Sequence, residues 1–344
     1  MPRVGLIYDP VYIEHDTGNH VENSGRLTTT MSVLQETGVL ERTTLFPPRP
    51  ASVDEIALVH SRQYIDQVRA MCVRGGGSLD LDTVISSGSY DAALMAAGGT
   101  VTAADALMNK TLNHAFCLVR PPGHHASCWH GAGFCLFNNI AIAARYLLAH
   151  YAIERILIVD FDVHHGNGTQ DTFYTDPNVL YFSTHQYPLY PGSGTLNETG
   201  KGDGQGLNIN IPMSPGCGDP EYQTIYEDIL APIAMRYNPQ IILASAGYDG
   251  HWADQLASMQ LSVFGYFRIA QILKVLADKL CGGKLLFTLE GGYNQQALAY
   301  AIAATLNVLN GSGDFDDPLG VKDSVANAVD FHKFVKMLQE KHEI

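Results

Sequence analysis

The 344-residue sequence predicts an α/β fold in which a mostly parallel sheet has helices on both faces. Short apolar runs rich in β-branched residues recur along the chain, and in runs such as residues 156–159 the apolar side chains do not alternate with polar ones. Runs of this kind are typical of strands that are buried on both faces of a parallel sheet. Longer stretches with helical spacing separate the runs, and strands that alternate with helices build right-handed crossovers.

This alternation assigns most of the chain to elements. The expected strands are residues 4–8, 115–119, 155–159, 179–183, 240–245 and 284–289. The expected helices are residues 89–108, 139–150, 221–237, 263–280 and 295–309. Because a segment rich in Gly and Asp follows, residues 1–312 are predicted to form one compact domain and residues 313–344 a C-terminal extension. A helix near residues 325–340 is expected to pack on that same domain.

Composition and charge narrow the classes of partner. The 21 basic and 35 acidic residues give a net charge of −14, which argues against nucleic acid and favours a cationic partner. The six cysteines include no Cys-x-x-Cys pair, so neither a disulfide framework nor a cysteine zinc site is expected. No stretch approaches the apolar length of a membrane span or of a signal peptide. We therefore expect a cytoplasmic protein without membrane partners, and the sequence leaves a homo-oligomer open.

Polar side chains follow four of the expected strands. In an open parallel sheet, ligands bind beyond the carboxyl ends of the strands, so these side chains are expected to meet at one edge. Chance explains polar residues after one strand but not histidine pairs, aspartates and a tyrosine after four. The residues concerned are His124, His125, Asp160, Asp162, His164, Asp249 and Tyr293.

Asp160, Asp162 and His164 occupy alternate positions, so in an extended chain they point to one side. A carboxylate and an imidazole placed in this way can bind one metal ion, and Asp249 is the best candidate for a third ligand. This donor set suits zinc with a position open for water or substrate, although iron(II) or cobalt could also enter. In the alternative interpretation Asp160 and Asp162 cap the next helix, and His164 and His165 are core residues. The coincidence of all these residues disfavours that alternative.

His124 and His125 follow a rigid Pro-Pro-Gly turn, and adjacent imidazoles suit acid–base catalysis. One could take a proton from water while the other donates to a leaving amine. The alternative is a pair of surface histidines. Tyr293 follows two glycines and would be a neutral phenol that donates a hydrogen bond to a developing oxyanion.

At these residues the sequence resembles the zinc-dependent histone deacetylase superfamily, which also contains acetylpolyamine amidohydrolases. Asn167 and the three residues after it resemble the class II branch, because class I relatives carry Asp at this place. The similarity covers nearly the whole chain. The motifs that carry it are His20-Val21-Glu22, Arg26-Leu27, Gly133-Phe134-Cys135, Asp160–Gly168, Ser245–Asp249 and Glu290–Tyr293.

The resemblance implies an arginase-like three-layer fold with about eight strands, and a catalytic domain over residues 1–312. It implies one Zn²⁺ ion bound by Asp162, His164 and Asp249, with His124, His125 and Tyr293 as the catalytic residues. It further implies that Asp160 orients His124, that Asn167 stands beside His125, and that Gly133, Phe134 and Tyr190 line a tunnel for the acyl-lysine stem. A potassium site is implied at Asp160, Asp162, His164, Ser183 and Thr184.

Four positions matter for how far the resemblance extends. Val21 and Gly25 replace prolines that are common in the family, and Tyr190 stands where many members have Phe. The related arginases need a second carboxylate where this chain has Gly166, which speaks against a two-manganese site.

The first functional hypothesis is a deacetylase that acts on acetylated lysine in proteins or peptides. The alternative within the enzyme class is an acetylpolyamine or other small-amide deacetylase, which the acidic charge suits equally. A hypothesis from another class is a metalloprotein that binds acyl-lysine without turnover. The presence of Tyr293 argues against it.

Overall fold

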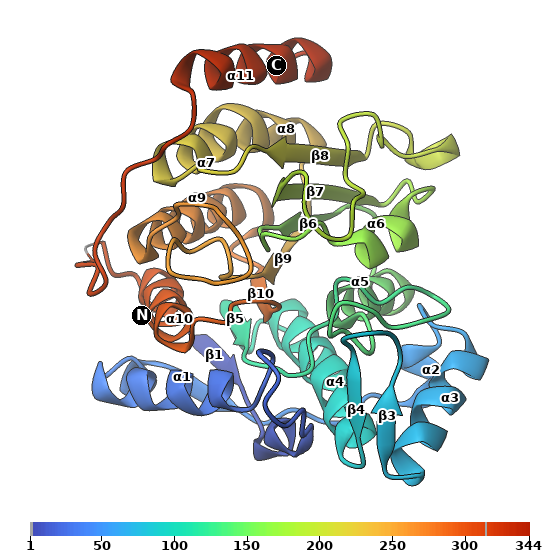
Figure 1. Cartoon of the computed structure of the whole chain (residues 1–344). Helices are drawn as coiled ribbons and strands as arrows, with labels where there is room; N and C mark the ends of the chain where they lie inside the picture. Colours follow the sequence, from blue (N-terminus) through green and yellow to red (C-terminus); the bar gives the residue numbers. More distant parts are fainter. Residues whose placement is uncertain (1–2, 314) are drawn as a thin grey trace.

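In the computed structural model, which describes residues 3–313 and 315–344, eight strands form one sheet in the order β2-β1-β5-β10-β9-β6-β7-β8 (Figure 1). Every pairing between neighbours in this sheet is parallel. A separate antiparallel pair, β3 (Gly76–Ser78) and β4 (Val84–Ser86), lies outside it. The sheet strands are β1 (Val4–Ile7), β2 (Thr44–Phe46), β5 (His114–Cys117), β6 (Ile156–Asp160), β7 (Val179–Gln186), β8 (Asn208–Met213), β9 (Ile241–Ala246) and β10 (Leu285–Leu289).

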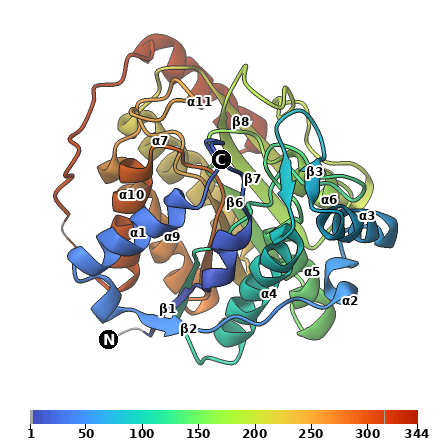
Figure 2. The same ribbon diagram turned by 60° about the horizontal axis from the view of Figure 1, so that its bottom comes forward.

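Helices cover both faces of the sheet and so make three layers (Figure 2). The layer on one face consists of α1 (Gly25–Glu36), α7 (Asp219–Ile225), α8 (Ala231–Tyr237), α9 (Val263–Cys281) and α10 (Gln295–Leu309). The layer on the other face consists of α4 (Ser89–Met108), α5 (Asn139–His150) and α6 (Asn167–Phe173), with α2 (Val53–Ile56) and α3 (Arg62–Val73) beside them. Short 3-10 turns lie at η1 (Pro10–Glu14), η2 (Leu40–Arg42) and η3 (Gly202–Gly204).

The predicted α/β fold with about eight strands is confirmed, and α4 and α5 have the predicted bounds. The helix expected over residues 221–237 is confirmed as a continuous helical stretch from residue 219 to residue 237, within which the π-helical turn η4 (Tyr226–Leu230) lies between α7 and α8. Pro232, at the start of α8, has no N–H to continue a regular ladder. Two edge strands were not predicted from apolar runs, because β2 has only three residues and β8 contains two asparagines.

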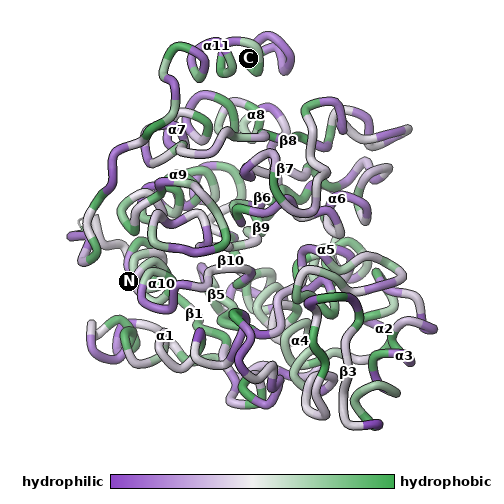
Figure 3. Tube along the Cα trace, in the orientation of Figure 1, coloured by the Kyte–Doolittle hydropathy of each residue, from purple (hydrophilic) through white to green (hydrophobic). Residues whose placement is uncertain are grey.

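The core sits on both faces of the sheet, as continuous apolar strands require. All residues of β5, β6, β9 and β10 are buried. Phe116 and Phe287 stack across neighbouring strands with ring centroids 6.1 Å apart. Figure 3 shows hydrophobic segments along the strands and their covering helices, with hydrophilic ones mainly in outer loops. This core holds the strand ends in fixed register.

After α10 the chain runs along the outside of the domain as a segment that we call the C-terminal strap (residues 315–327), and it ends in α11 (Ala328–His342) (Figure 1). The strap contacts the domain at Gly320, whose carbonyl accepts the indole N–H of Trp252 at 3.1 Å. Val335 and Leu338 of α11 are buried. The helix begins three residues later than predicted, and the division at residue 312 stays a prediction.

Among the described helices, none has the length and apolar character needed to cross a membrane. The cytoplasmic location and the absence of nucleic-acid partners stay predictions.

Candidate active site

The four central strands of the sheet bring the predicted site residues together. β5, β10, β9 and β6 are consecutive neighbours, and each is followed by one of the segments singled out in the sequence. Ser245 near the end of β9 lies in register with Asp160 on β6 and with Thr288 on β10. Segments far apart in the sequence therefore emerge side by side at one edge of the sheet.

Three donor groups converge beyond β6 and β9. Nδ1 of His164 lies 3.2 Å from Oδ1 of Asp162 and 3.1 Å from Oδ2 of Asp249. The other carboxylate oxygens accept backbone hydrogen bonds, from Gly291 N–H to Asp162 at 2.8 Å and from Val163 N–H to Asp249 at 3.0 Å. One donor atom of each of the three residues lies within 4.8 Å of the other two. This spacing is compatible with one ion at ligand distances of about 2.0–2.2 Å.

Two glycines leave the space that these carboxylates occupy. A Cβ on Gly247 would lie 2.0 Å from Oδ2 of Asp162, and a Cβ on Gly291 would lie 2.2 Å from Oδ2 of Asp249. Any larger residue at either position would displace a carboxylate. The two glycines are therefore a steric requirement of the donor cluster.

The electrostatics of this cluster also fit a cation. Burial raises the pKa of Asp249 to about 6, and the charge of Asp162 adds to the rise. Burial opposes ionisation of Asp162 as well, but His124 and His164 hold its pKa well below the usual range. Burial disfavours the charged form of His164, yet its two carboxylate partners raise its pKa to about 10. A divalent ion would replace that imidazole proton and relieve the repulsion between the carboxylates.

The two adjacent histidines have different partners. Nδ1 of His124 lies 3.1 Å from Oδ2 of Asp160, which also accepts the hydroxyl of Tyr181 at 2.9 Å. Nδ1 of His125 lies 2.8 Å from Oδ1 of Asn167. Because an amide oxygen only accepts, His125 carries its proton on Nδ1 and leaves the lone pair on Nε2.

These partners set opposite charge states. Burial would lower the pKa of His124, but Asp160 and Asp162 outweigh it and raise the pKa to about 10. Burial lowers the pKa of His125 well below its usual value, and the neighbouring positive charges of His124 and His164 lower it further. The rings lie 4.0 Å apart. The adjacent pair therefore consists of one charged imidazole, His124, and one neutral imidazole, His125.

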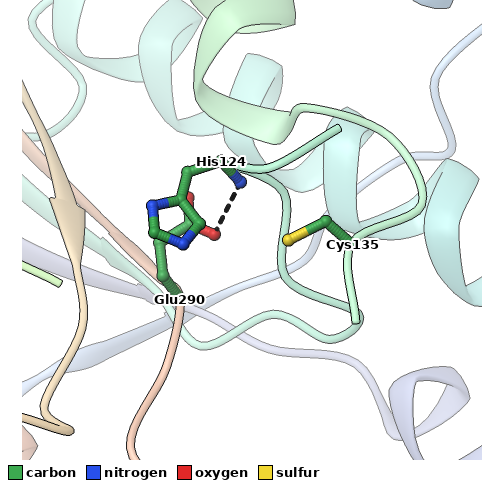
Figure 4. Close-up of side chains that lie close together, drawn as sticks. All are labelled: His124, Cys135 and Glu290. Carbon is green, nitrogen blue, oxygen red and sulfur yellow. Dashed lines mark hydrogen bonds between the residues drawn. The ribbon is translucent and has the colours of Figure 1, made fainter. Parts of the chain in front are cut away.

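His124 belongs to a second group of metal-ligating residue types, with Cys135 and Glu290 (Figure 4). Oε2 of Glu290 accepts the N–H of Gly123 at 2.7 Å and of His124 at 3.1 Å, and Oε1 accepts the hydroxyl of Ser245 at 3.1 Å. Burial raises the pKa of Cys135 well above its usual value, so the residue is a thiol. With both carboxylate oxygens engaged, the group is better suited to hold the histidine turn than to bind an ion.

Of the residues predicted to line the tunnel, Tyr190 and Gly133 lie next to His125, and Phe134 lies next to Tyr293. The ring of Tyr190 lies 5.0 Å from that of His125, and the ring of Phe134 lies 5.6 Å from that of Tyr293. A Cβ on Gly133 would lie 2.4 Å from Cδ2 of His125, and its φ of +53° also favours glycine. The hydroxyl of Tyr190 gives the wall of the predicted tunnel a polar edge.

Tyr293 lies close enough to the donor cluster for the charges of Asp249 and Asp162 to act on its hydroxyl, and the Arg26 guanidinium lies 5.1 Å from its ring centroid. Burial raises the pKa of Tyr293 well above its usual value, and the charge of Asp249 raises it further. The phenol is thus a neutral hydrogen-bond donor.

Two buried groups belong to the site although the sequence indicated no role for them. Arg26 donates to the carbonyls of Gly292 at 2.7 Å and Glu290 at 2.5 Å. Glu22 pairs with Arg26 at 3.2 Å and with Arg120 at 2.6 Å. The resemblance motifs contain Glu22 and Arg26, but only the fold shows that they support the Tyr293 segment.

Ser183 and Thr184, expected near a potassium ion, lie on β7. Ser183 is in register with Asp160 and its Oγ lies 2.9 Å from Nδ1 of His185. Oγ1 of Thr184 lies 3.2 Å from the hydroxyl of Tyr226. Potassium binding by this set stays a prediction.

Comparison with known proteins shows the family to which the chain belongs. The model of the family described as the histone deacetylase domain matches residues 20–309. The chain belongs to the histone deacetylase family.

Individual relatives extend over most of the chain. A probable deacetylase of Archaeoglobus fulgidus is 42% identical over 316 residues, covering 91% of this chain and 87% of that protein. A histone deacetylase-like amidohydrolase of Pseudomonas aeruginosa is 35% identical over 312 residues, covering 90% and 81%. The crystal structure of the HDA15 HD domain matches with a TM-score of 0.91 and 32% identity, covering 99% of this chain and 94% of that one. The resemblance and its arginase-like fold are confirmed.

The donor cluster predicts one divalent ion per chain, held in part by Asp249. Because Asp249→Ala removes one of three donor groups, we expect elemental analysis of the purified variant to give less than about a tenth of the wild-type metal content. Asp105→Ala is the control, since that carboxylate accepts the hydroxyls of Tyr146 and Tyr151. Two ions per wild-type chain, or full retention in Asp249→Ala, would contradict the assignment.

Proposed function

We propose that this protein is a zinc-dependent amidohydrolase that removes acetyl groups from lysine ε-amines of proteins or peptides. The observation that carries the proposal is the meeting of a neutral imidazole, a charged imidazole, a phenol and a three-donor cluster at one edge of the sheet. Asp162, His164 and Asp249 would hold the zinc ion, which when bound would supply Lewis-acid activation of the acetyl carbonyl and of the attacking water.

The remaining steps fall to the protein's own side chains. Nε2 of His125 takes a proton from water as the water oxygen adds to the carbonyl carbon, while Asn167 keeps the ring oriented. Tyr293 donates a hydrogen bond to the carbonyl oxygen as negative charge develops there. The charged His124, held by Asp160, stabilises that charge. The C–N bond then breaks, and the proton taken from water passes from the imidazole pair to the leaving nitrogen. The acetic acid so formed gives its proton to the amine, so that acetate and an ammonium group result.

Acetylpolyamines are the second substrate candidate, and the negative charges of Asp80 and Asp82 near Tyr190 favour them. Asp80 and Asp82 are exposed and act on the pKa of Tyr190, which burial raises first and their charges raise further. Carboxylates at this position would attract a cationic chain.

The two substrate classes are separated by measuring kcat/KM for an acetyl-lysine peptide and for an acetylpolyamine with the same zinc-loaded preparation. We expect the peptide to be the better substrate. A higher kcat/KM for the polyamine would make the protein a small-amide deacetylase, and stoichiometric binding of the peptide without turnover would make it an acyl-lysine-binding metalloprotein.

Tyr293→Phe removes only the phenolic hydroxyl, so the fold and the metal content should be unchanged. We expect kcat to fall by about 10²–10³, which is the usual loss when one oxyanion donor is removed. Tyr300→Phe, on the adjacent helix α10, is the matched control and should retain activity. A Tyr293→Phe kcat within about threefold of wild type, at equal metal content, would remove Tyr293 from the mechanism.

Asn167→Asp places a carboxylate beside His125 and tests which histidine is the base. A negative partner raises the pKa of the imidazole, and catalysis needs the neutral form, so activity should be lost at a higher pH than in wild type. In the plot of kcat/KM against pH, we expect the fall on the acidic side to occur at a pH about one unit or more higher than in wild type. An unchanged pH dependence in a variant that keeps its metal would place the base elsewhere.

A further inference from the structure

The segment that carries Tyr293 is held by a carboxylate from a different loop. Oδ2 of Asp254 accepts the backbone N–H of Tyr293 at 2.6 Å and of Asn294 at 2.8 Å. Asp254 is only 7% exposed and belongs to residues 251–261, which we call the Asp254 loop. A buried carboxylate that accepts two amide hydrogens makes charge-assisted contacts, which are stronger than neutral ones. The Tyr293 backbone is therefore fixed from the side of this loop.

Asp254 is not needed to cap the following helix. Asn294 is the N-cap residue of α10, and its own Oδ1 accepts the N–H of Ala297 at 3.1 Å. The two amides that Asp254 binds precede the first helical residue, Gln295. What Asp254 fixes is therefore the path of the chain through Tyr293, just before the helix begins.

This path would otherwise have considerable freedom. Gly291 and Gly292 precede Tyr293, and Gly292 has a φ of +118° that only glycine adopts readily. Arg26 holds the carbonyl of Gly292 on one side of Tyr293, and Asp254 holds the amides of Tyr293 and Asn294 on the other. The backbone at Tyr293 is thus held on one side by Arg26 and on the other by Asp254, in a turn that the two glycines would otherwise leave free to move.

The Asp254 loop is itself firmly placed. Nδ2 of Asn294 donates to the carbonyl of Ala253 at 3.0 Å, and Oδ1 of Asp254 accepts the N–H of Leu256 at 3.0 Å. Trp252 donates its backbone N–H to Leu261 at 2.8 Å and its indole N–H to Gly320 of the C-terminal strap at 3.1 Å. Because the loop is fixed, Asp254 can hold the Tyr293 backbone in one place.

We infer that Asp254 is a positioning residue, which sets the phenol of Tyr293 for the carbonyl oxygen through the backbone amides of residues 293 and 294. The inference rests on the proposed function, in which Tyr293 acts as the donor. Misplacement of a reacting group by about 1 Å can cost about 100-fold in rate, so loss of this anchor should be visible in kcat.

The experiment is a double-mutant cycle on an acetyl-lysine peptide with Asp254→Ala, Tyr293→Phe and the two together. We expect Asp254→Ala to lower kcat about 10–100-fold with KM within about twofold and metal content unchanged. In the Tyr293→Phe background the same substitution should cost less than about twofold, because residues that act as a unit are not additive. Asp254→Asn keeps an oxygen acceptor and should restore most of the kcat lost in Asp254→Ala.

Asp219→Ala is the matched control. Its carboxylate accepts the N–H and the hydroxyl of Ser262, next to the far end of the Asp254 loop, at 2.9 and 2.6 Å. It should leave kcat within about twofold of wild type, whereas an effect as large as that of Asp254→Ala would mean that general loosening of the loop is responsible. If Asp254→Ala does not fold, the cycle is run with Asp254→Asn, whose smaller loss should likewise vanish in the Tyr293→Phe background.

The outcomes separate the two hypotheses. An effect of Asp254→Ala that is undiminished in the Tyr293→Phe background, or absent in both, would overturn the positioning role while the Tyr293 mechanism stands. If Tyr293→Phe alone leaves kcat unchanged, the proposed function of the phenol fails, and the positioning role fails with it.

Discussion

The structure depends on two carboxylates, Asp162 and Asp249, that are buried side by side at the carboxyl edge of the sheet. Removing such charges from water is unfavourable unless each is paired or binds a cation. The surrounding chain supplies backbone donors to one oxygen of each carboxylate and a histidine nitrogen between the others. Glycines at 247 and 291 leave the room that the carboxylates need. Much of the local sequence is therefore explained by the need to hold two buried carboxylates and a histidine together.

The same neighbourhood makes two adjacent histidines chemically different. His124 faces Asp160 and is charged, whereas His125 faces the neutral amide of Asn167 and the positive charge of its neighbour, and is neutral. Glu290 accepts the backbone N–H groups of Gly123 and His124, so the backbone of the histidine turn is held in place as well as the side chains.

The sequence predicted the central sheet because β6, β9 and β10 consist almost entirely of apolar residues, and α4 and α5 because helical spacing extends over their whole length. β8 was missed because its asparagines interrupt the apolar run. Motif spacing at strand ends, with the family resemblance, named the candidate site residues. Asp254, Arg26 and Glu290 could not be assigned roles, since each acts through backbone groups that only the fold brings near.

The central claim is that Asp162, His164 and Asp249 together hold a single zinc ion. Anomalous X-ray diffraction at the zinc edge, from crystals of the zinc-loaded protein, tests it most directly. The account predicts one strong peak per chain, within ligand distance of one oxygen of each aspartate and of Nδ1 of His164. A peak at His124, Cys135 and Glu290 instead, or two peaks in one chain, would contradict it.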